Sequence, residues 1–331
     1  MTPAGAATIV VMPRLRPPGP RRRPAPRIVV VGDLVLDVVL APEGPLQTGT
    51  DVPGRVSLVQ GGSAANTARW LGRLGANASL VCAVGRDATG RALVSAVRSD
   101  GVTPRVVRVA GARTGRIGVL VTAGGERSFV QDRGAALQLA PADLRPEWFS
   151  RADVLHVPTY SLLGEPLGLA GMRAVELARA AGATISADLS SIVPLLADGR
   201  EAARARMAEL NPDLLFATAA EAEALLGTNR PDGLLEFAPT AIVKRGPKGA
   251  TILTRGSVGE GLLRFEVATR QVAALDTTGA GDAFTAGFLV VWFTARAAGH
   301  PVTASLQRAA LAGHRAAARQ LTTPRPEISF D

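Results

Sequence analysis

Short apolar runs of β type alternate with longer helical stretches from Arg27 onward, and this alternation limits the folds that the chain can adopt. The runs are nearly continuous in Val, Ile, Leu and Ala, as expected of strands that are buried on both faces. We expect strands at residues 28–31, 79–84, 154–157, 184–187, 214–217 and 241–244. Strands and helices in alternation predict an α/β fold, namely a doubly wound, mostly parallel sheet with helices on both faces.

Three of the intervening helical stretches end at a glycine. Glycine most easily adopts the left-handed conformation that closes a helix. The three stretches cover residues 63–74, 91–100 and 166–181, and they are followed by Gly75, Gly101 and Gly182. These glycines indicate where the helices between the strands end.

Two regions do not follow the alternation, and we expect them to form a small β-sheet lid. Residues 38–60 and 105–133 carry short β-type runs punctuated by Gly, Pro and Thr, with no helical stretch. Such runs separated by turn residues are typical of hairpins. A lid beside the main sheet would exclude water from a site between the two.

The N-terminal arm, residues 1–26, is rich in Pro and Arg, and we expect it to be disordered. Residues 1–27 contain six arginines and no acid, so the net charge of +9 falls to +3 without them. Most of the basic excess, which would otherwise suggest nucleic-acid binding, therefore belongs to this N-terminal segment. Residues 27–331 are expected to form one domain that includes the lid strands.

Several classes of site and location are excluded by composition. Cys82 is the only cysteine, so no intramolecular disulfide forms, and we expect a reducing, cytoplasmic location. The three histidines are scattered without the spacing of a zinc site. No apolar run approaches the roughly 20 residues that a membrane-spanning helix needs, so we expect no membrane partner.

The strongest chemical signal is the sequence DTTGAGDAF, residues 276–284, which leads into an apolar helical stretch. Small residues at 279–281 let the backbone turn tightly with its N–H groups outward, and the helix that begins there adds a positive dipole end. These features predict an anion hole for a transferred phosphate. Asp282, in the first turn, is placed to take a proton from a hydroxyl facing that phosphate. A glycine-rich helix start with a capping Asp would show the same pattern.

A second signal is the sequence GGSAANTA, residues 61–68. Gly61 and Gly62 would let a ligand approach the backbone closely, and Asn66, one turn later, offers donors and an acceptor suited to a polyol. The alternative is a Gly-Gly turn in which Ser63 caps the helix.

Together, in this order and about 215 residues apart, the two segments resemble the signatures of the ribokinase-like (PfkB) family of carbohydrate and nucleoside kinases. The resemblance covers roughly residues 27–325, because intervening landmarks also occur in sequence. It implies a ribokinase-like domain with a β-sheet lid, which transfers the γ-phosphate of ATP, with Mg²⁺, to a hydroxyl of a small sugar-type substrate.

The resemblance also assigns roles to individual residues. Asp282 looks like the catalytic base, and Gly279, Ala280 and Gly281 look like the anion hole. Asp37, Gly61, Gly62 and Asn66 correspond to the substrate-binding residues. Gly246, Gly249 and Thr278 correspond to nucleotide contacts, and residues 309–317 to a helix beside the adenine.

For metals, the resemblance implies Mg²⁺ held through water by Glu221, although Thr218 stands where many members have Asn. Some members bind K⁺ through residues that correspond to Asp276 and Thr278. The chain's only lysines, Lys244 and Lys248, flank the nucleotide loop. Both lysines would assist the donor phosphates. Alternatively, Lys244 would simply end a strand and Lys248 would lie in a solvated turn.

Two other functions stay open on the sequence alone. A nucleoside kinase of the same fold would need an aromatic lid residue to stack on a base, and the candidates are Phe129, Trp148 and Tyr160. A nucleic-acid-binding or regulatory protein on the kinase fold would instead use the arginine-rich arm, although an intact Asp282 speaks against lost catalysis. The resemblance also allows a homodimer formed through the lid.

Overall fold

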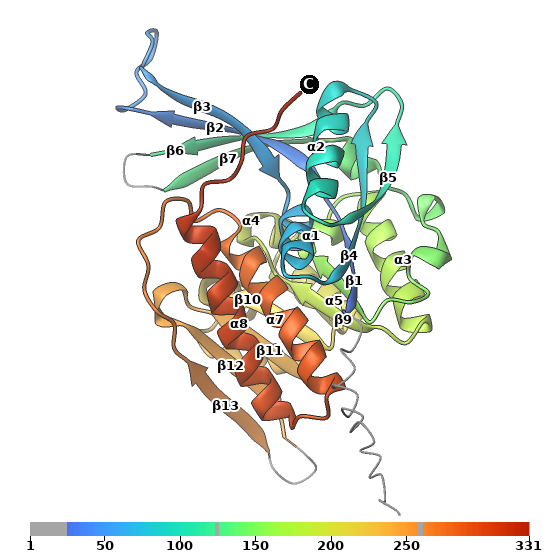
Figure 1. Ribbon diagram of the computed structural model, residues 1–331. Helices are drawn as coiled ribbons and strands as arrows, with labels where there is room; N and C mark the ends of the chain where they lie inside the picture. The colour runs from blue at the N-terminus through green and yellow to red at the C-terminus, as the bar shows by residue number, and fades with distance from the viewer. Residues whose placement is uncertain (1–24, 123–125, 257–260, 331) are drawn as a thin grey trace, which may run out of the picture.

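The computed structural model describes residues 25–122, 126–256 and 261–330. Its centre is a nine-stranded sheet in the order β13-β12-β11-β10-β9-β8-β1-β4-β5 (Figure 1). Its strands are β1 (Arg27–Val31), β4 (Asn77–Gly85), β5 (Thr103–Val109), β8 (Val154–Pro158), β9 (Thr184–Asp188), β10 (Leu214–Thr218), β11 (Thr240–Lys244), β12 (Ala250–Arg255) and β13 (Leu262–Val267). The expected arm at residues 1–26 lies outside the described residues except for its last two.

The sheet is mostly parallel, as the alternation predicts. All neighbouring strands from β5 to β11 run parallel, and the two antiparallel pairs of this sheet are β11 with β12 and β12 with β13. All six strands expected from the apolar runs are present. The doubly wound, mostly parallel fold class is therefore confirmed.

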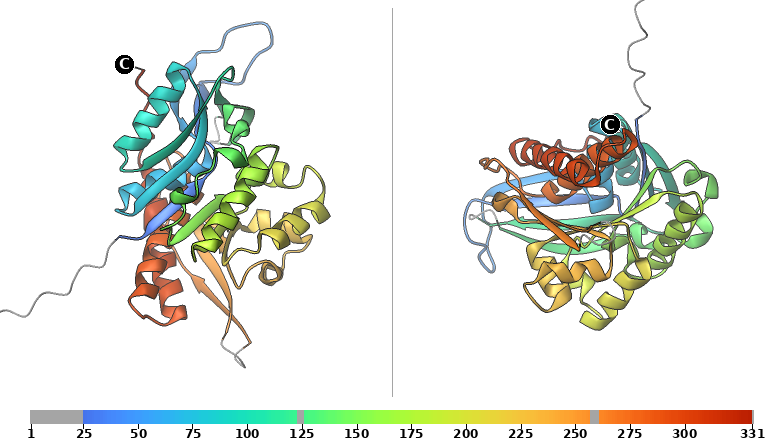
Figure 2. Two further views of the ribbon diagram at one scale, coloured as in Figure 1. Left: turned by 90° about the vertical axis from the view of Figure 1, so that its right-hand side faces the viewer. Right: turned by 90° about the horizontal axis from the view of Figure 1, so that it is seen from below.

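Helices cover both faces of this sheet and form two separate cores with it. One face packs against α1 (Ser63–Arg73), α2 (Ala88–Ser99), α7 (Ala280–Ala297) and α8 (Val302–Thr322). The other packs against α3 (Leu167–Ala180), α5 (Arg200–Leu210) and α6 (Ala219–Leu226), and a short α4 (Ile192–Leu195) lies nearby. Figure 2 shows α7 and α8 on the opposite side of the sheet from the green and yellow helices. Among the described residues, no helix is long and apolar enough to cross a membrane.

The helix ends follow from the glycines. Gly75, Gly101 and Gly182, which follow α1, α2 and α3, have φ values of +82°, +81° and +80°. A side chain at these φ values would be strained, which explains why the three helices end where glycine occurs.

A separate four-stranded sheet forms beyond β1 and is the expected lid. Its order is β3-β2-β6-β7, and its strands are β2 (Val35–Pro42), β3 (Gly54–Gly61), β6 (Thr114–Val121) and β7 (Arg127–Gly134). Residues 105–109, which we expected in the lid, belong instead to β5 at the edge of the large sheet. They pair in parallel with β4, because α2 returns the chain to that edge.

One face of the lid packs on a small core of its own, around Val35, Ile117 and Val119. The lid also exposes apolar side chains, of which Val56 and Val130 are 62% and 78% exposed. The homodimer through the lid stays a prediction.

Candidate active site

The carboxyl ends of the central strands carry polar side chains into a common depression. Asp188 ends β9, Thr218 ends β10, Lys244 ends β11 and Asp33 follows β1. All four line a cavity of about 810 Å³ that the lid strands help to enclose. Parallel strands end at the same edge of a sheet, so residues distant in sequence meet there. We call this cavity the acceptor cavity.

A second cavity, of about 830 Å³, lies on the other side of the α7 N-terminus. Its lining includes Gly246 and Gly249, the glycines expected at the nucleotide loop, and we call it the donor cavity. The carboxyl half of α8 supplies His314 and Leu321. Of residues 309–317, which we expect beside the adenine, His314 and Ala317 line this cavity, whereas Ala309 and Ala310 are buried in the core.

The two cavities meet at the start of α7. Thr218, Lys244 and Gly281 line both of them. Gly279 and Asp282 line the acceptor cavity, and Ala280 lines the donor cavity. A group passing from one cavity to the other therefore passes the first turn of this helix.

The small residues in the first turn of α7 leave room for another group to lie close to the backbone. Gly279, the residue before the helix, has φ +76°, which strains any other residue. A Cβ on Gly281 would lie 3.3 Å from Lys244 Nζ and would narrow the junction. The Ala280 N–H donates to the Thr277 carbonyl at 3.3 Å. The N–H groups of Gly281 and Asp282 follow in the first turn, where backbone N–H groups have no acceptor within the helix.

The Asp282 carboxylate does not cap its own helix, which rules out the capping alternative. Its Oδ1 accepts from Ser63 Oγ at 2.8 Å, and its Oδ2 accepts from Asn66 Nδ2 at 3.0 Å. Burial raises the pKa of Asp282 to about 7, against the effect of these two hydrogen bonds. A carboxyl group with a pKa near neutrality can accept and release a proton at ordinary pH.

Lys244 ends β11, as its alternative interpretation expects, and its side chain is only 12% exposed. Its Nζ donates to Asp188 Oδ2 at 2.5 Å, and Thr285 Oγ1 donates to the same oxygen at 3.0 Å. Burial alone would lower the pKa of Lys244, but the Asp188 and Glu221 carboxylates raise it above its ordinary value. Lys244 therefore stays protonated at the junction between the cavities, where it forms an ion pair with Asp188.

Glu221 lies in the first turn of α6 and takes part in a capping box. Its Oε2 accepts from the Thr218 N–H at 2.7 Å, while Thr218 Oγ1 accepts from the Glu221 N–H at 3.2 Å. Only 8% of Glu221 is exposed, and it lines the acceptor cavity. Burial raises its pKa, with Lys244 acting in the opposite direction.

The donor set around Glu221 fits Mg²⁺ held through water. The described residues contain no cluster of three or more His, Cys, Asp or Glu that could cage a metal. Mg²⁺ typically uses one or two carboxylates together with waters and substrate phosphates, so a single carboxylate at this edge suffices.

The other residues that we expect to bind the substrate are Asp37, on strand β2 of the lid, and Gly61, Gly62 and Asn66. Asp37, Gly62 and Asn66 line the acceptor cavity. Gly61 does not line it, and a Cβ at Gly61 would collide with the Asp37 carboxylate. Asp37 is 5% exposed, and its Oδ2 accepts from Arg325 Nη1 at 2.7 Å.

Asp276 and Thr278 do not fit a K⁺ site. Asp276 Oδ1 accepts from Arg127 Nη2 at 2.7 Å, and Oδ2 accepts from Arg325 Nε at 2.9 Å. The Thr278 carbonyl accepts from Gln320 Nε2 at 3.0 Å. Both carboxylate oxygens of Asp276 and the Thr278 carbonyl thus accept from N–H donors, two of them cationic guanidinium groups. Among the described residues, only the buried Thr278 Oγ1 at this site has no hydrogen-bond partner.

Sequence reasoning missed Arg325 and the role of Ser63. Arg325 links Asp37 in the lid with Asp276 in the loop before α7, and nothing near Arg325 in sequence indicates this. Ser63 was considered only as a helix cap, yet the residue before α1 is Gly62, and no side chain caps the helix. The position of Ser63 beside Gly61-Gly62 was the available signal.

Known proteins resemble this chain in sequence. A family model described as "pfkB family carbohydrate kinase" matches residues 25–328. Fructokinase-1 of Oryza sativa subsp. japonica is 33% identical over 275 residues, which cover 79% of this chain and 81% of the relative. Fructokinase-2 of Solanum lycopersicum is 32% identical, with coverages of 79% and 80%.

Solved structures resemble the fold. A putative Ribokinase II from E. coli has a TM-score of 0.76 at 22% identity, covering 91% of this chain and 94% of that one. Adenosine kinase from Sinorhizobium meliloti also has a TM-score of 0.76, at 23% identity, with coverages of 92% and 97%. The chain belongs to the pfkB family of carbohydrate kinases. It is a phosphotransferase that uses an alcohol group as acceptor.

Proposed function

We propose that the protein transfers the γ-phosphate of ATP to a hydroxyl of a free sugar of the ketohexose type, with fructose as the first acceptor to test. The observation that carries this proposal is that the donor and acceptor cavities meet at the N-terminus of α7, beside Asp282. The fructokinases to which the chain is 32–33% identical support the choice of acceptor.

On the donor side, ATP would place its adenosine between the nucleotide loop and α8, with its phosphates at the α7 N-terminus. A helix N-terminus and small residues favour bound phosphate. The proposed anion hole consists of residues 279–281, and Lys244 adds a buried positive charge beside it. A solved E. coli structure of the same fold contains ATP and Mg²⁺. Glu221 would hold Mg²⁺ through water, and the ion would offset negative charge on the phosphates.

In the transfer, the acceptor hydroxyl oxygen forms a bond to the γ-phosphorus, and the bond from that phosphorus to the β-γ bridging oxygen breaks, releasing ADP. Asp282 accepts the hydroxyl proton. Its two donors, Ser63 and Asn66, hold the carboxylate in one orientation. Because the transition state is loose, most of the acceleration comes from positioning and charge stabilisation.

On the acceptor side, Asp33, Asp37 and Asn66 offer the groups that bind a polyol. Carboxylate oxygens accept strong hydrogen bonds from neighbouring hydroxyls. Arg325 fixes Asp37 by an ion pair, so this carboxylate is already oriented. K⁺ has no part in the proposal, because Asp276 and Thr278 already accept from N–H donors.

A nucleoside acceptor is the second candidate, and one observation favours it. Phe129, on β7 of the lid, is 51% exposed and lines the acceptor cavity together with Tyr160. An aromatic ring there could stack on a base. Trp148 does not line this cavity. The arginine-rich arm of the nucleic-acid alternative lies outside the described residues.

The test is ADP release by purified protein with ATP and Mg²⁺ across free sugars, sugar phosphates and nucleosides. We expect the highest kcat/KM with fructose and a loss of turnover in Asp282→Asn. Phe129→Ala separates the candidates, since it should raise the KM of a nucleoside far more than that of fructose. Turnover of a nucleoside but of no free sugar would replace the first candidate, and an active Asp282→Asn variant would refute the base assignment.

A further inference from the structure

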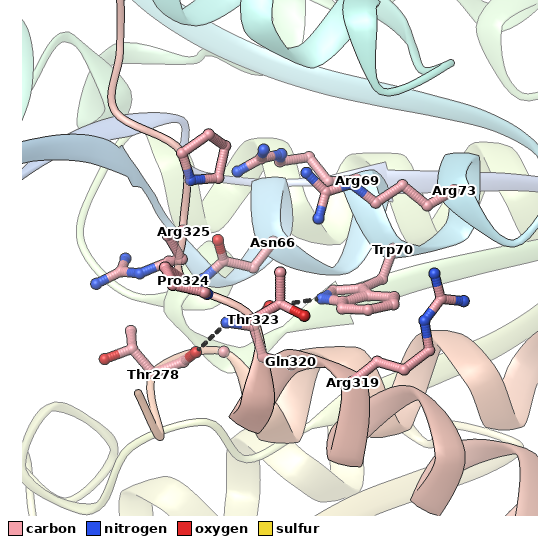
Figure 3. A pocket seen from close by; sticks show the side chains of 12 residues that line it. Asn66, Arg69, Trp70, Arg73, Thr278, Arg319, Gln320, Thr323, Pro324 and Arg325 are labelled. Carbon is pink, nitrogen blue, oxygen red and sulfur yellow. Dashed lines mark hydrogen bonds between the residues drawn. The ribbon is translucent and has the colours of Figure 1, made fainter. Parts of the chain in front are cut away.

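A third cavity lies behind the anion-hole loop, between α1, the last turn of α8 and the C-terminal segment (Figure 3). Its volume is about 370 Å³. Four of the twelve side chains in its lining are arginines, and none is a carboxylate. We call it the arginine pocket, and its arginines are Arg69, Arg73, Arg319 and Arg325.

The charge of this pocket is not balanced by its surroundings. Arg69 and Arg73 share one carboxylate, that of Asp100, which lies outside the lining. Arg319 has no carboxylate partner among the described residues. Arg325 pairs with two carboxylates on the active-site side, one of which it shares with Arg127. The group of Arg69, Arg73, Arg319 and Asp100 therefore carries a net charge of +2.

The arginines are held in place before any ligand arrives. The guanidinium carbons of Arg73 and Arg319 lie 5.7 and 5.6 Å from the ring centre of Trp70, within the range of cation–π contact. Arg69 has a side chain only 7% exposed, so its charge is poorly screened by water. Planar guanidinium groups in fixed positions suit a phosphate, which they bind through paired hydrogen bonds.

The pocket is joined to the catalytic loop by two hydrogen bonds. Trp70 Nε1 donates to Gln320 Oε1 at 2.9 Å, and Gln320 Nε2 donates to the Thr278 carbonyl at 3.0 Å (Figure 3). Thr278 directly precedes Gly279 of the proposed anion hole. Asn66, which donates to Asp282, also lines the pocket.

We propose that the arginine pocket binds a phosphate group, either as free phosphate or as the phosphomonoester of a small metabolite. A dianion matches the local charge of +2. The cavity also has room for a carbon skeleton, with Trp70 and Pro324 as apolar walls. The pocket shares Asn66, Thr278 and Gly279 with the acceptor cavity, but none of its four arginines lines the donor or the acceptor cavity.

The experiment measures binding, so it is independent of the proposed function. The thermal midpoint is followed against inorganic phosphate, a hexose monophosphate and chloride at equal ionic strength. Each titration is run with and without Mg²⁺ and a non-hydrolysable ATP analogue, which fills the anion hole. We expect phosphate or the hexose monophosphate, but not chloride, to raise the midpoint with the analogue present. Stabilisation by the hexose monophosphate alone would identify the phosphomonoester as the ligand.

Variants locate the site. Arg319→Ala and the double variant with Arg73→Ala should raise the apparent Kd for phosphate about tenfold or more, as expected when a charge-assisted contact is lost. Arg315→Ala is the matched control, because Arg315 is an exposed arginine of α8 that does not line the pocket, and its Kd should equal that of the wild type. Equal stabilisation in all variants, or an equal effect of chloride, would overturn the proposal.

Discussion

Replacing Asp282 by Asn should stabilise the protein above neutral pH while it removes activity. Burial raises the pKa of Asp282 to about 7, against about 3.9 in an unfolded chain. Between these values the folded state keeps a proton that the unfolded state has released, so the free energy of unfolding falls as pH rises toward 7. Asn has no charge to bury, so the free energy of unfolding of the variant does not fall in this way as pH rises.

The size of the effect follows from the pKa shift. The interval between about pH 5 and the folded-state pKa near 7 spans about two pH units. Each unit lowers the free energy of unfolding of the wild type by about 1.36 kcal/mol, so the total loss is about 3 kcal/mol. The stability of the variant relative to wild type should therefore rise by about this amount between about pH 5 and pH 8. For a domain of about 300 residues this corresponds to about 5 °C in Tm. Over the same range, kcat/KM of the wild type should rise with pH, as expected for a base that must be ionised.

The assay is thermal unfolding of wild type and variant across this pH range, together with ADP release. We expect kcat to fall about 10²- to 10⁴-fold in the variant, the usual contribution of a general base. Asp51→Asn is the control, because Asp51 is exposed in the turn between β2 and β3. A Tm difference that stays constant from acid to alkaline pH would show that Asp282 is not a destabilised carboxylate, and the reasoning would fail.

Three further outcomes test other parts of the site. Glu221→Gln should increase the Mg²⁺ concentration that gives half-maximal velocity, measured by Mg²⁺ titration at saturating ATP; an unchanged value would exclude the water-mediated role. Gly281→Val should lower kcat at least about tenfold with little change in Tm, because its side chain would enter the junction beside Lys244; full activity would place the transfer path elsewhere. Replacing NaCl by KCl should leave kcat unchanged, since Asp276 and Thr278 already accept from N–H donors, and activation specific to K⁺ would contradict this.

Most of the large sheet could be predicted from sequence because its strands are buried on both faces. Continuous apolar runs such as residues 28–31 and 214–217 have few other structures open to them. Residues 105–109 were misassigned because an edge strand is half-exposed and its pattern resembles that of a lid hairpin. Only the pairing of β5 with β4 shows that these residues belong to the large sheet.

The site was predictable where its chemistry lies in one short segment. The backbone conformation of residues 279–282 could be predicted from this segment alone, since small residues and a helix start occur together there. The burial of Lys244 was not predictable, because it depends on Asp188, 56 residues earlier in the chain. The contacts of Asp276 with Arg127 and Arg325 depend on the packing of three separate segments, which local sequence does not encode.

The ion pair between Asp37 and Arg325 has a consequence for synthesis of the chain. The two residues are 288 positions apart. A ribosome that builds the protein from its N-terminus releases Asp37 long before its partner exists, and contacts of such long range form late. Until Arg325 is synthesised, no ion pair from the C-terminal segment connects Asp37 in the lid with Asp276 in the loop before α7. Nascent chains that already contain both signature segments but not yet Arg325 should therefore lack a fully oriented acceptor site.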